Sequence, residues 1–271
     1  MPELTWYYPD NPKALRDLLK QPGVFPHGGG TALLKRDITR MTGLIDLSGL
    51  PYRDIQIDHK KIRLGAMSTY ADVVDTLSLE DPDHLLIHAL QSAASTPLRN
   101  RITIGGSVAG FPVWSDLMGP LLAMDTEISL FGSVNETVPI QEYVTNAELR
   151  KETLVTTVSF PNKSQRGFYH RETRTVVDYP AFTVTILLEE VEGTVSAMRV
   201  VLIGTTKKFA ILDTLADACI GKPVSDLNAA DVELPGDVTF PNRKHGSSDY
   251  LREMALLSLR RGLERLAGGD A

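Results

Sequence analysis

The sequence of 271 residues predicts an α+β fold in two parts. Residues 1–161 alternate short apolar runs, typical of strands, with short segments of helical periodicity. After residue 161 the pattern changes to two long strand-like runs and a long closing helix. Glycine-rich stretches at 28–32 and 103–107 occur only in the first part. We therefore predict a first domain over residues 1–161 and a second over 162–271.

The first part is expected to open with a helix over residues 12–20. Pro12 suits a first helical turn, and Leu15, Leu18 and Leu19 share one face of that helix. A second helix is expected from residue 70, with Ser68 or Thr69 as its cap, and a third over 84–95 that Pro97 ends. Apolar runs predict strands over 23–26, 42–50, 61–69, 101–104 (before the glycine pair) and 153–161, and a helix followed by a strand over 116–132.

The second part is expected to contain strands over 181–190 and 193–204 and a helix over 207–221. A closing helix is predicted over 247–266. Its apolar stripe consists of Leu256, Leu259, Leu263 and Leu266.

The composition excludes several classes of function. The net charge is −6 at pH 7, which argues against a nucleic-acid or anionic-membrane surface, so an anionic ligand is expected to be held locally by backbone N–H groups. Cys219 is the only cysteine, so this chain alone forms no disulfide, iron–sulfur cluster or cysteine-based zinc site. The first residues lack the build of a signal peptide, and no apolar run is long enough to span a bilayer. A cytoplasmic location is expected.

The stretch FPHGGGTALL (25–34) partly matches a dinucleotide fingerprint. Gly28 and Gly30 fit the first two glycines of G-x-G-x-x-G, and Asp46 could imitate the acidic residue that binds a ribose. The third glycine position is Leu33, however, and Pro26 lies in the strand that should precede the loop. These two departures from the fingerprint argue against a true Rossmann site. A plain tight turn, the simpler explanation, does not account for three successive glycines.

The stretch GGSVAG (105–110) resembles the nucleophile elbow of serine hydrolases around Ser107. An elbow needs a helix directly after the serine, and Gly110 and Pro112 disfavour a long helix there. Ser107 is better explained as a small residue in a backbone loop.

Two further candidates have ordinary explanations. His84 and His88 are four residues apart, which suits zinc on a helix face, but residue 85 is Leu and no third ligand is evident. Asp116 precedes an apolar segment, so it either caps a helix or accepts a hydrogen bond from a ligand hydroxyl.

The pair of glycine-rich loops remains. Two such loops that converge can surround a polyphosphate with N–H donors, which suits an anion in an acidic protein. This arrangement would bind a dinucleotide without Rossmann topology.

These loops resemble those of the FAD-binding subunits of molybdenum hydroxylases, which include the medium subunits of carbon monoxide dehydrogenases and the flavin domains of xanthine dehydrogenases. GGGTALL resembles the family's A-G-G-T-D-L-L, and TIGGSVAGFPVWSDL resembles its T-I-G-G-N loop with a downstream Asp. The segments LIDLSGL, FYHRETRTVVDYPAFTV and HGSSDYLREMALLSLRRGL are similar to further family segments, so the resemblance covers nearly the whole chain. Ala32 stands where the family usually has an acidic residue, Ser107 where it has Asn, and His170 where a Lys is common.

The resemblance implies a fold like that of vanillyl-alcohol oxidase (PCMH-type). FAD would lie between two α/β subdomains, about 1–50 and 51–161, and the C-terminal α+β domain 162–271 would cover it. Backbone amides of the first loop would wrap the diphosphate, and the second loop would form the other wall. The FAD-contacting residues that it implies are Gly28, Gly29, Gly30, Thr31, Ala32, Leu33, Thr103, Ile104, Gly105, Gly106, Ser107, Gly110, Asp116, Leu154, His170 and Asp178.

The implied function is electron transfer without a catalytic acid or base on this chain. Iron–sulfur clusters would sit on a partner subunit and molybdopterin on a large subunit, in a heterotrimer or a dimer of heterotrimers. FAD would link these clusters to an external acceptor, which could be NAD, a quinone or oxygen. A stand-alone flavin oxidase and an assembly subunit without flavin are the alternatives.

Overall fold

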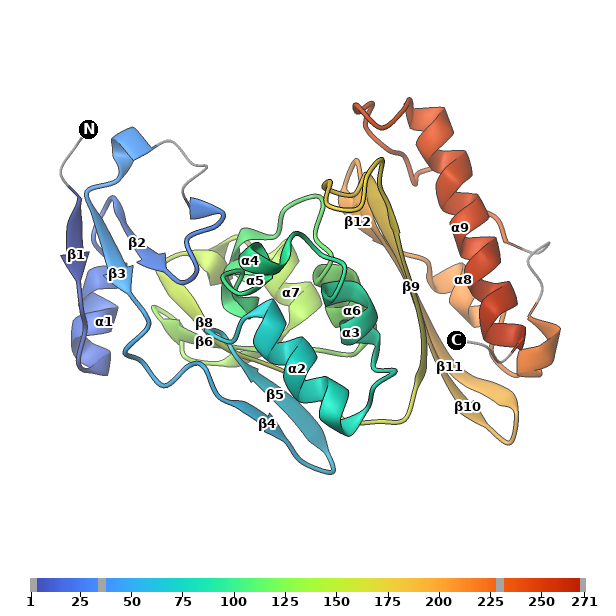
Figure 1. Cartoon of the computed structure of the whole chain (residues 1–271), viewed down its shortest axis with the longest axis horizontal. Helices are drawn as coiled ribbons and strands as arrows, with labels where there is room; N and C mark the ends of the chain where they lie inside the picture. Colours follow the sequence, from blue (N-terminus) through green and yellow to red (C-terminus); the bar gives the residue numbers. More distant parts are fainter. Residues whose placement is uncertain (1–3, 34–37, 228–231, 269–271) are drawn as a thin grey trace. The chain divides into compact units, whose positions relative to one another are not determined.

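The computed structural model of the protein describes residues 4–33, 38–227 and 232–268. The chain forms two compact units that alternate along the sequence (Figure 1). The first consists of Met1–Leu79, Ser95–Phe111 and Asp125–Asn162, and the second of Glu80–Ala94, Pro112–Met124 and Lys163–Ala271. Each unit mixes helices and strands, as the sequence predicts. The assignment of 1–161 and 162–271 to separate domains stays a prediction.

A small parallel sheet of order β1-β3-β2 belongs to the first unit. Its strands are β1 (Thr5–Tyr7), β2 (Val24–His27) and β3 (Gly43–Asp46). Helix α1 (Pro12–Leu19) connects β1 to β2 and buries Leu15 and Leu19, which confirms the first predicted helix. Asn11 caps it by accepting a hydrogen bond from the Ala14 amide over 2.9 Å. Because β2 is an edge strand, it tolerates Pro26.

The first unit also contains an antiparallel sheet of order β4-β5-β8-β6-β7. Helix α5 packs against β5 and β8 of this sheet, which brings the second glycine-rich stretch onto it. The strands are β4 (Ile55–Ile57), β5 (Lys61–Gly65), β6 (Glu127–Gly132), β7 (Thr137–Pro139) and β8 (Thr153–Pro161). The helical elements are α2 (Tyr70–Glu80), α4 (Thr96–Arg99), α5 (Ile104–Gly110) and α7 (Ile140–Thr145), with 3₁₀ turns η2 (Ile38–Arg40) and η3 (Glu148–Arg150).

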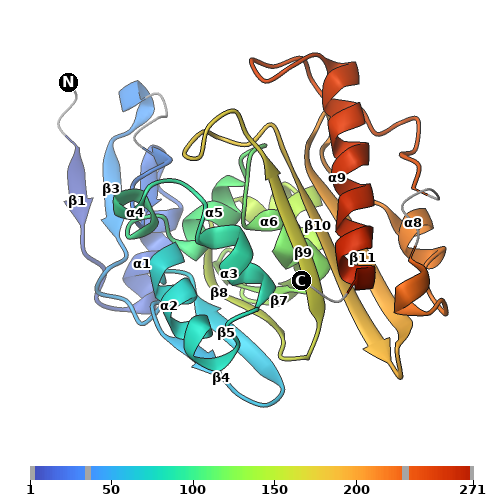
Figure 2. The same ribbon diagram turned by 45° about the vertical axis from the view of Figure 1, so that its right-hand side comes forward.

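The second unit is built on an antiparallel sheet of order β12-β11-β10-β9, and Figure 2 shows α9 lying along it. One face of β10 packs on α9, and the opposite face packs on α6, because successive side chains of a strand alternate between faces. The strands are β9 (Arg166–Glu172), β10 (Phe182–Val191), β11 (Thr194–Thr205) and β12 (Lys208–Ile211). The helical elements are α3 (Leu85–Leu90), α6 (Met118–Ala123), α8 (Asp213–Asp217), η4 (Val224–Asp226) and α9 (Ser248–Gly268).

Three predicted elements differ from the structure. The strand expected over 101–104 does not form, because α5 begins at Ile104 and Thr103 makes only an isolated bridge with Thr69. The helix expected over 84–95 ends at Leu90, and Pro97 lies in the first turn of α4, where proline is tolerated. The helix expected over 207–221 is a strand, β12, followed by the short α8. Within the described part of the chain, no helix is long and apolar enough to cross a membrane.

Candidate functional site

The first glycine loop leaves β2 and packs closely against the segment that precedes α5. A Cβ atom at Gly29 would lie 1.4 Å from the Arg101 carbonyl oxygen, and one at Gly28 would lie 2.9 Å from Thr103 Oγ1. Gly30 adopts φ +74°, a conformation that side chains rarely allow. Gly28 and Gly29 are therefore required for the close packing on Arg101 and Thr103, and Gly30 for the backbone conformation that follows.

Backbone donors remain in this first loop. No described residue accepts a hydrogen bond from the amides of Gly29, Gly30 or Thr31. Successive N–H groups without an acceptor form a typical binding site for an anion such as a diphosphate. Thr31 is half-buried and Ala32 is exposed, so the end of the loop remains accessible.

In the second stretch, the amides from Ile104 to Ser107 all donate hydrogen bonds within the protein. The Ile104 amide donates to the Ser68 carbonyl over 2.9 Å and the Gly105 amide to the Ala66 carbonyl over 2.8 Å. Thr103 caps α5 by accepting from the Gly106 amide over 3.2 Å. The expectation of free N–H donors at Ile104, Gly105 and Gly106 is therefore wrong, because the start of α5 is anchored to the turn after β5.

Side chains at the second stretch complete this anchoring. Ser107 Oγ donates to the Thr103 carbonyl over 3.0 Å, so it is not an exposed nucleophile at a strand-to-helix turn. A Cβ at Gly105 would lie 2.5 Å from Ala66 Cβ, whereas Gly110 at the end of α5 faces open space. This stretch thus forms a rigid wall beside the first loop.

Arg101 is a candidate that the sequence analysis did not identify. Its Nη2 lies 3.6 Å from the position that a Cβ at Gly30 would occupy, and its residue is exposed. No acceptor for its guanidinium occurs among the described residues. The available signal was a basic residue two positions before Thr103, at the start of the ITIGG motif.

Two other predicted residues of the first unit have structural roles. Leu154 is buried in a core cluster with Leu15 and Ile45, which accounts for its apolar character. Asp46 accepts a hydrogen bond from the Ser48 amide over 2.8 Å, and this bond lowers the pKa of its carboxyl group. Asp46 therefore stabilises the turn after β3, which accounts for it without a role in ribose binding.

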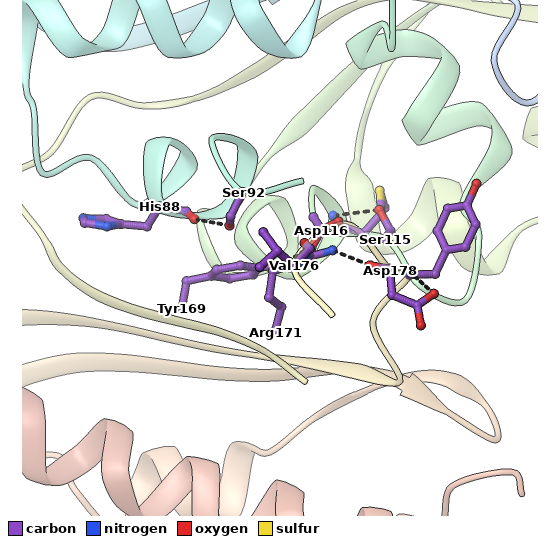
Figure 3. A network of polar contacts seen from close by, with 10 residues as sticks. His88, Ser92, Ser115, Asp116, Tyr169, Arg171, Val176 and Asp178 are labelled. Carbon is purple, nitrogen blue, oxygen red and sulfur yellow. Dashed lines mark hydrogen bonds and ion pairs between the residues drawn. The ribbon is translucent and has the colours of Figure 1, made fainter. Parts of the chain in front are cut away.

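Asp116 lies at the centre of a buried polar network in the second unit (Figure 3). Its Oδ1 accepts hydrogen bonds from Tyr169 Oη over 2.7 Å and Arg171 Nε over 2.9 Å. Burial raises the pKa of the Asp116 carboxyl, while Arg171 and Tyr169 act in the opposite direction. Asp116 does not cap α6, whose N-cap position is Leu117; the Met118 amide at the start of this helix donates to Ser115 Oγ over 3.2 Å.

Arg171 also connects this network to the segment that carries Asp178. Its Nη1 and Nη2 donate to the carbonyl oxygens of Val176 and Asp178, over 2.9 and 3.0 Å. Asp178 pairs with Lys244 Nζ at 2.7 Å, and this hydrogen bond lowers the pKa of the carboxyl group. The structure thus brings together Asp116 and the backbone at Asp178, which the sequence left unconnected.

The remaining second-unit candidates are His170 and the histidine pair. His170, on β9, places Nε2 3.3 Å from Glu172 Oε2. His84 is the N-cap of α3, where its Nδ1 accepts from the Leu86 amide over 3.2 Å, so it does not share a helix face with His88. Burial lowers the pKa of His84. Among the described residues, no group of three His, Cys, Asp or Glu side chains is arranged to hold a metal ion.

A cavity of about 460 Å³ also lies in the second unit. The rings of Trp114 and Tyr179 form part of its wall, with their centroids 5.0 Å apart. Arg243 and Lys244 contribute to the lining, but each is already bonded, to Ala181 O and to Asp178 respectively.

A mixed α and β chain with a glycine loop of free amides, packed on a second glycine-rich stretch, is suited to bind a diphosphate. The family model described as the FAD binding domain in molybdopterin dehydrogenase matches residues 2–163. The chain belongs to this family. It is an FAD-binding subunit of a molybdenum-containing oxidoreductase, as the resemblance implies.

Two curated relatives support the same assignment. The glyceraldehyde dehydrogenase medium chain of Sulfolobus acidocaldarius is 22% identical over 267 residues, which cover 94% of this chain and 95% of the relative. The nicotine 6-hydroxylase medium subunit of Paenarthrobacter nicotinovorans is 24% identical over 246 residues, or 86% of each chain.

Solved structures show the same fold. Quinoline 2-oxidoreductase from Pseudomonas putida 86 matches with a TM-score of 0.88 and 20% identity, covering 99% of this chain and 98% of the other. Carbon monoxide dehydrogenase from Hydrogenophaga pseudoflava matches with a TM-score of 0.84 and 23% identity, with 99% and 98% coverage.

Proposed function

We propose that this chain binds the diphosphate of FAD with the first glycine loop and relays electrons from a partner subunit to an external acceptor. One observation carries the proposal: no described residue accepts a hydrogen bond from the backbone amides of Gly29, Gly30 and Thr31. FAD, when bound, exchanges electrons singly or in pairs, which suits it to link one-electron clusters with a two-electron acceptor. The protein binds and orients the cofactor and needs no acid or base for this task.

The remaining site assignments follow from the same proposal. Gly28, Ala32 and Leu33 would complete the first loop, while α5 would form the second wall through the surface of its first turns rather than through amide bonds. We propose a PCMH-type arrangement for the first domain, 1–161, with the C-terminal domain 162–271 covering the flavin. The other residues proposed to contact FAD are Thr103, Ile104, Gly105, Gly106, Ser107, Gly110, Asp116, Leu154, His170 and Asp178.

The partners are proposed from the chemistry of this chain and the names of its relatives. Cys219 is the only cysteine and is buried, so iron–sulfur clusters must be carried by another chain. Both curated relatives are medium chains of larger enzymes. We propose an iron–sulfur subunit and a molybdopterin-binding large subunit, assembled as a heterotrimer or its dimer.

The visible absorption spectrum of the purified chain tests the proposal. We expect flavin bands as isolated, or after addition of FAD and removal of the excess by gel filtration. A Gly29→Ala variant is the matched negative control. A chain that stays colourless after incubation with FAD would contradict the proposal, whereas reduction of bound flavin by an organic substrate without partners would indicate a stand-alone oxidase.

A further inference from the structure

We propose that Arg101 binds the diphosphate of the cofactor and makes the site selective for FAD over flavins that lack a diphosphate. The inference rests on the proposed function and deepens it, because it adds a charged side chain to a site expected to use backbone amides alone.

The position of Arg101 is fixed by its own backbone. The carbonyl oxygen of Arg101 occupies the space that a Cβ at Gly29 would fill, at 1.4 Å. The Arg101 amide donates to the Leu98 carbonyl over 2.9 Å, which ties the residue to α4. The loop and Arg101 are therefore held together by contacts within one compact unit.

The guanidinium lies beside the free amides. Nη2 is 3.6 Å from the Cβ position of Gly30, the central residue of the three whose amides have no acceptor among the described residues. The guanidinium itself has no carboxylate or carbonyl acceptor in the described part of the chain. Two other arginines of the same unit differ: Arg53 pairs with Asp72 at 3.2 Å, and Arg99 Nη2 donates to Thr96 Oγ1 over 3.0 Å.

The Arg101 guanidinium and the successive backbone amides together favour a diphosphate as the ligand. An arginine is charged at all relevant pH values, and its planar fork matches phosphate oxygens in two places. In a chain of net charge −6, one local cation beside successive N–H groups offsets the repulsion of a dianionic ligand. A flavin without phosphate gains nothing from either group.

Equilibrium titration of the full chain after removal of its FAD tests the inference. Flavin fluorescence or absorbance reports the Kd of FAD and of riboflavin, and competition reports that of ADP. For Arg101→Gln we expect the Kd of FAD and of ADP to rise about tenfold to a hundredfold, with riboflavin binding unchanged. The dependence of the FAD Kd on salt should weaken in the same variant, because a charge contact to phosphate has been removed.

Two further variants control for structural effects. Arg101→Lys keeps the charge but not the fork, so it should retain the salt dependence and bind FAD with intermediate affinity. Arg99→Gln removes a cation two residues away and should bind FAD as the wild type does. Thermal unfolding without FAD should be the same for Arg101→Gln and the wild type.

Different outcomes contradict different claims. If the wild type binds no FAD, the proposed function fails. If the wild type binds FAD but Arg101→Gln binds FAD and ADP with unchanged affinity, Arg101 is only a solvated surface arginine. A parallel loss of riboflavin affinity would mean that the variant disturbs the fold of the loop, and this too would overturn the inference.

Discussion

At the scale of single residues, Gly29 shows why the glycine run is present. A Cβ there would overlap the Arg101 carbonyl oxygen, so the loop can approach the second glycine-rich stretch only without a side chain. The glycines thus act first through contacts within the protein.

We predict that Gly29→Ala abolishes FAD retention and lowers the free energy of unfolding by about 2 kcal/mol or more, because the loop must move away from Arg101. Urea denaturation and the flavin spectrum measure the two effects. Gly49→Ala is the control, since no atom lies within 4 Å of its Cβ position. Equal stability of the two variants would show that the loop is not packed as described.

A second prediction at this scale concerns Asp178 and pH. The hydrogen bond from Lys244 lowers the pKa of Asp178, so this carboxylate stabilises the fold above its ordinary pKa of about 4 and loses that contribution as pH falls further. We expect Asp178→Asn to be less stable than the wild type at neutral pH, and the difference to shrink as the pH falls below about 4.

Urea denaturation across this pH range checks the Asp178 prediction. Asp213→Asn is a suitable control, because Asp213 is 70% exposed and its nearest cation, Arg199, is 3.8 Å away. A difference between Asp178→Asn and the wild type that does not change with pH would contradict the assignment of the ion pair.

At the scale of elements, the start of α2 supports the second glycine-rich stretch. Thr69 caps α2 and forms an isolated bridge with Thr103. The carbonyl oxygens of Ala66 and Ser68 accept hydrogen bonds from the amides of Gly105 and Ile104, respectively. The predicted cap at Ser68 or Thr69 is therefore confirmed for Thr69, whose Oγ1 accepts from the Asp72 amide over 3.1 Å.

We predict that Thr69→Ala lowers the free energy of unfolding by about 1 kcal/mol, because the Asp72 amide loses its acceptor. It should also weaken FAD binding, since the same turn anchors α5. Ser78→Ala, on the exposed side of α2, is the matched control. Chemical denaturation and FAD titration of both variants provide the measurements, and equal effects would contradict a special role for the cap.

Helix α9 contains a glycine whose role depends on packing. A Cβ at Gly262 would lie 2.6 Å from Phe168 Cδ1 and 2.7 Å from Ile186 Cδ1, so the helix lies very close to β9 and β10. In a helix interior, alanine is more favourable than glycine by about 1 kcal/mol. Forcing an extra methyl group into a packed core, however, lowers the free energy of unfolding by about 1–3 kcal/mol.

We therefore expect Gly262→Ala to lower the free energy of unfolding by about 1 kcal/mol, even though it raises helix propensity. The neighbouring exposed residue provides a control, because Arg261→Ala should change stability by less than about 0.5 kcal/mol. A more stable Gly262→Ala protein in urea denaturation would show that the contact is looser than described.

At the scale of the whole molecule, the two compact units exchange segments along the chain. Residues 80–94 and 112–124, which contain α3 and α6, belong to the second unit although they precede its sheet by many residues. Gly119 of α6 packs on Thr185 of β10, and Leu85 of α3 packs on Gly167 of β9. One face of the β12-β11-β10-β9 sheet is therefore covered by α3 and α6, two helices from the first half of the sequence.

This exchange predicts the behaviour of a C-terminal fragment. Residues 163–271 alone lack α3 and α6, so the face of β10 that carries Leu187 would be exposed to water. We expect this fragment to aggregate and to bind a hydrophobic dye, whereas the full chain does not. Size-exclusion chromatography and dye fluorescence check this, and a monomeric fragment that unfolds cooperatively would contradict it.

The sequence alone predicted the mixed fold class, α1, most strands, the paired glycine stretches and the family. It also predicts a domain boundary near residue 162, where hydrophobic periodicity changes, and this boundary stays a prediction. These features depend on short segments whose periodicity or motif is local, so no long-range contact is needed to detect them.

Only the tertiary structure decided which groups in those segments are available to a ligand. The sequence could not distinguish a strand from a helix at Ile104, because the helix is fixed by bonds to Ala66 and Ser68. Nor could it show that the amides of Gly29, Gly30 and Thr31 have no acceptor among the described residues, that those of Ile104, Gly105 and Gly106 are bonded, and that Arg101 lies beside Gly30. A motif records which residue types are present, but hydrogen-bond donors are satisfied by partners that only the fold brings near.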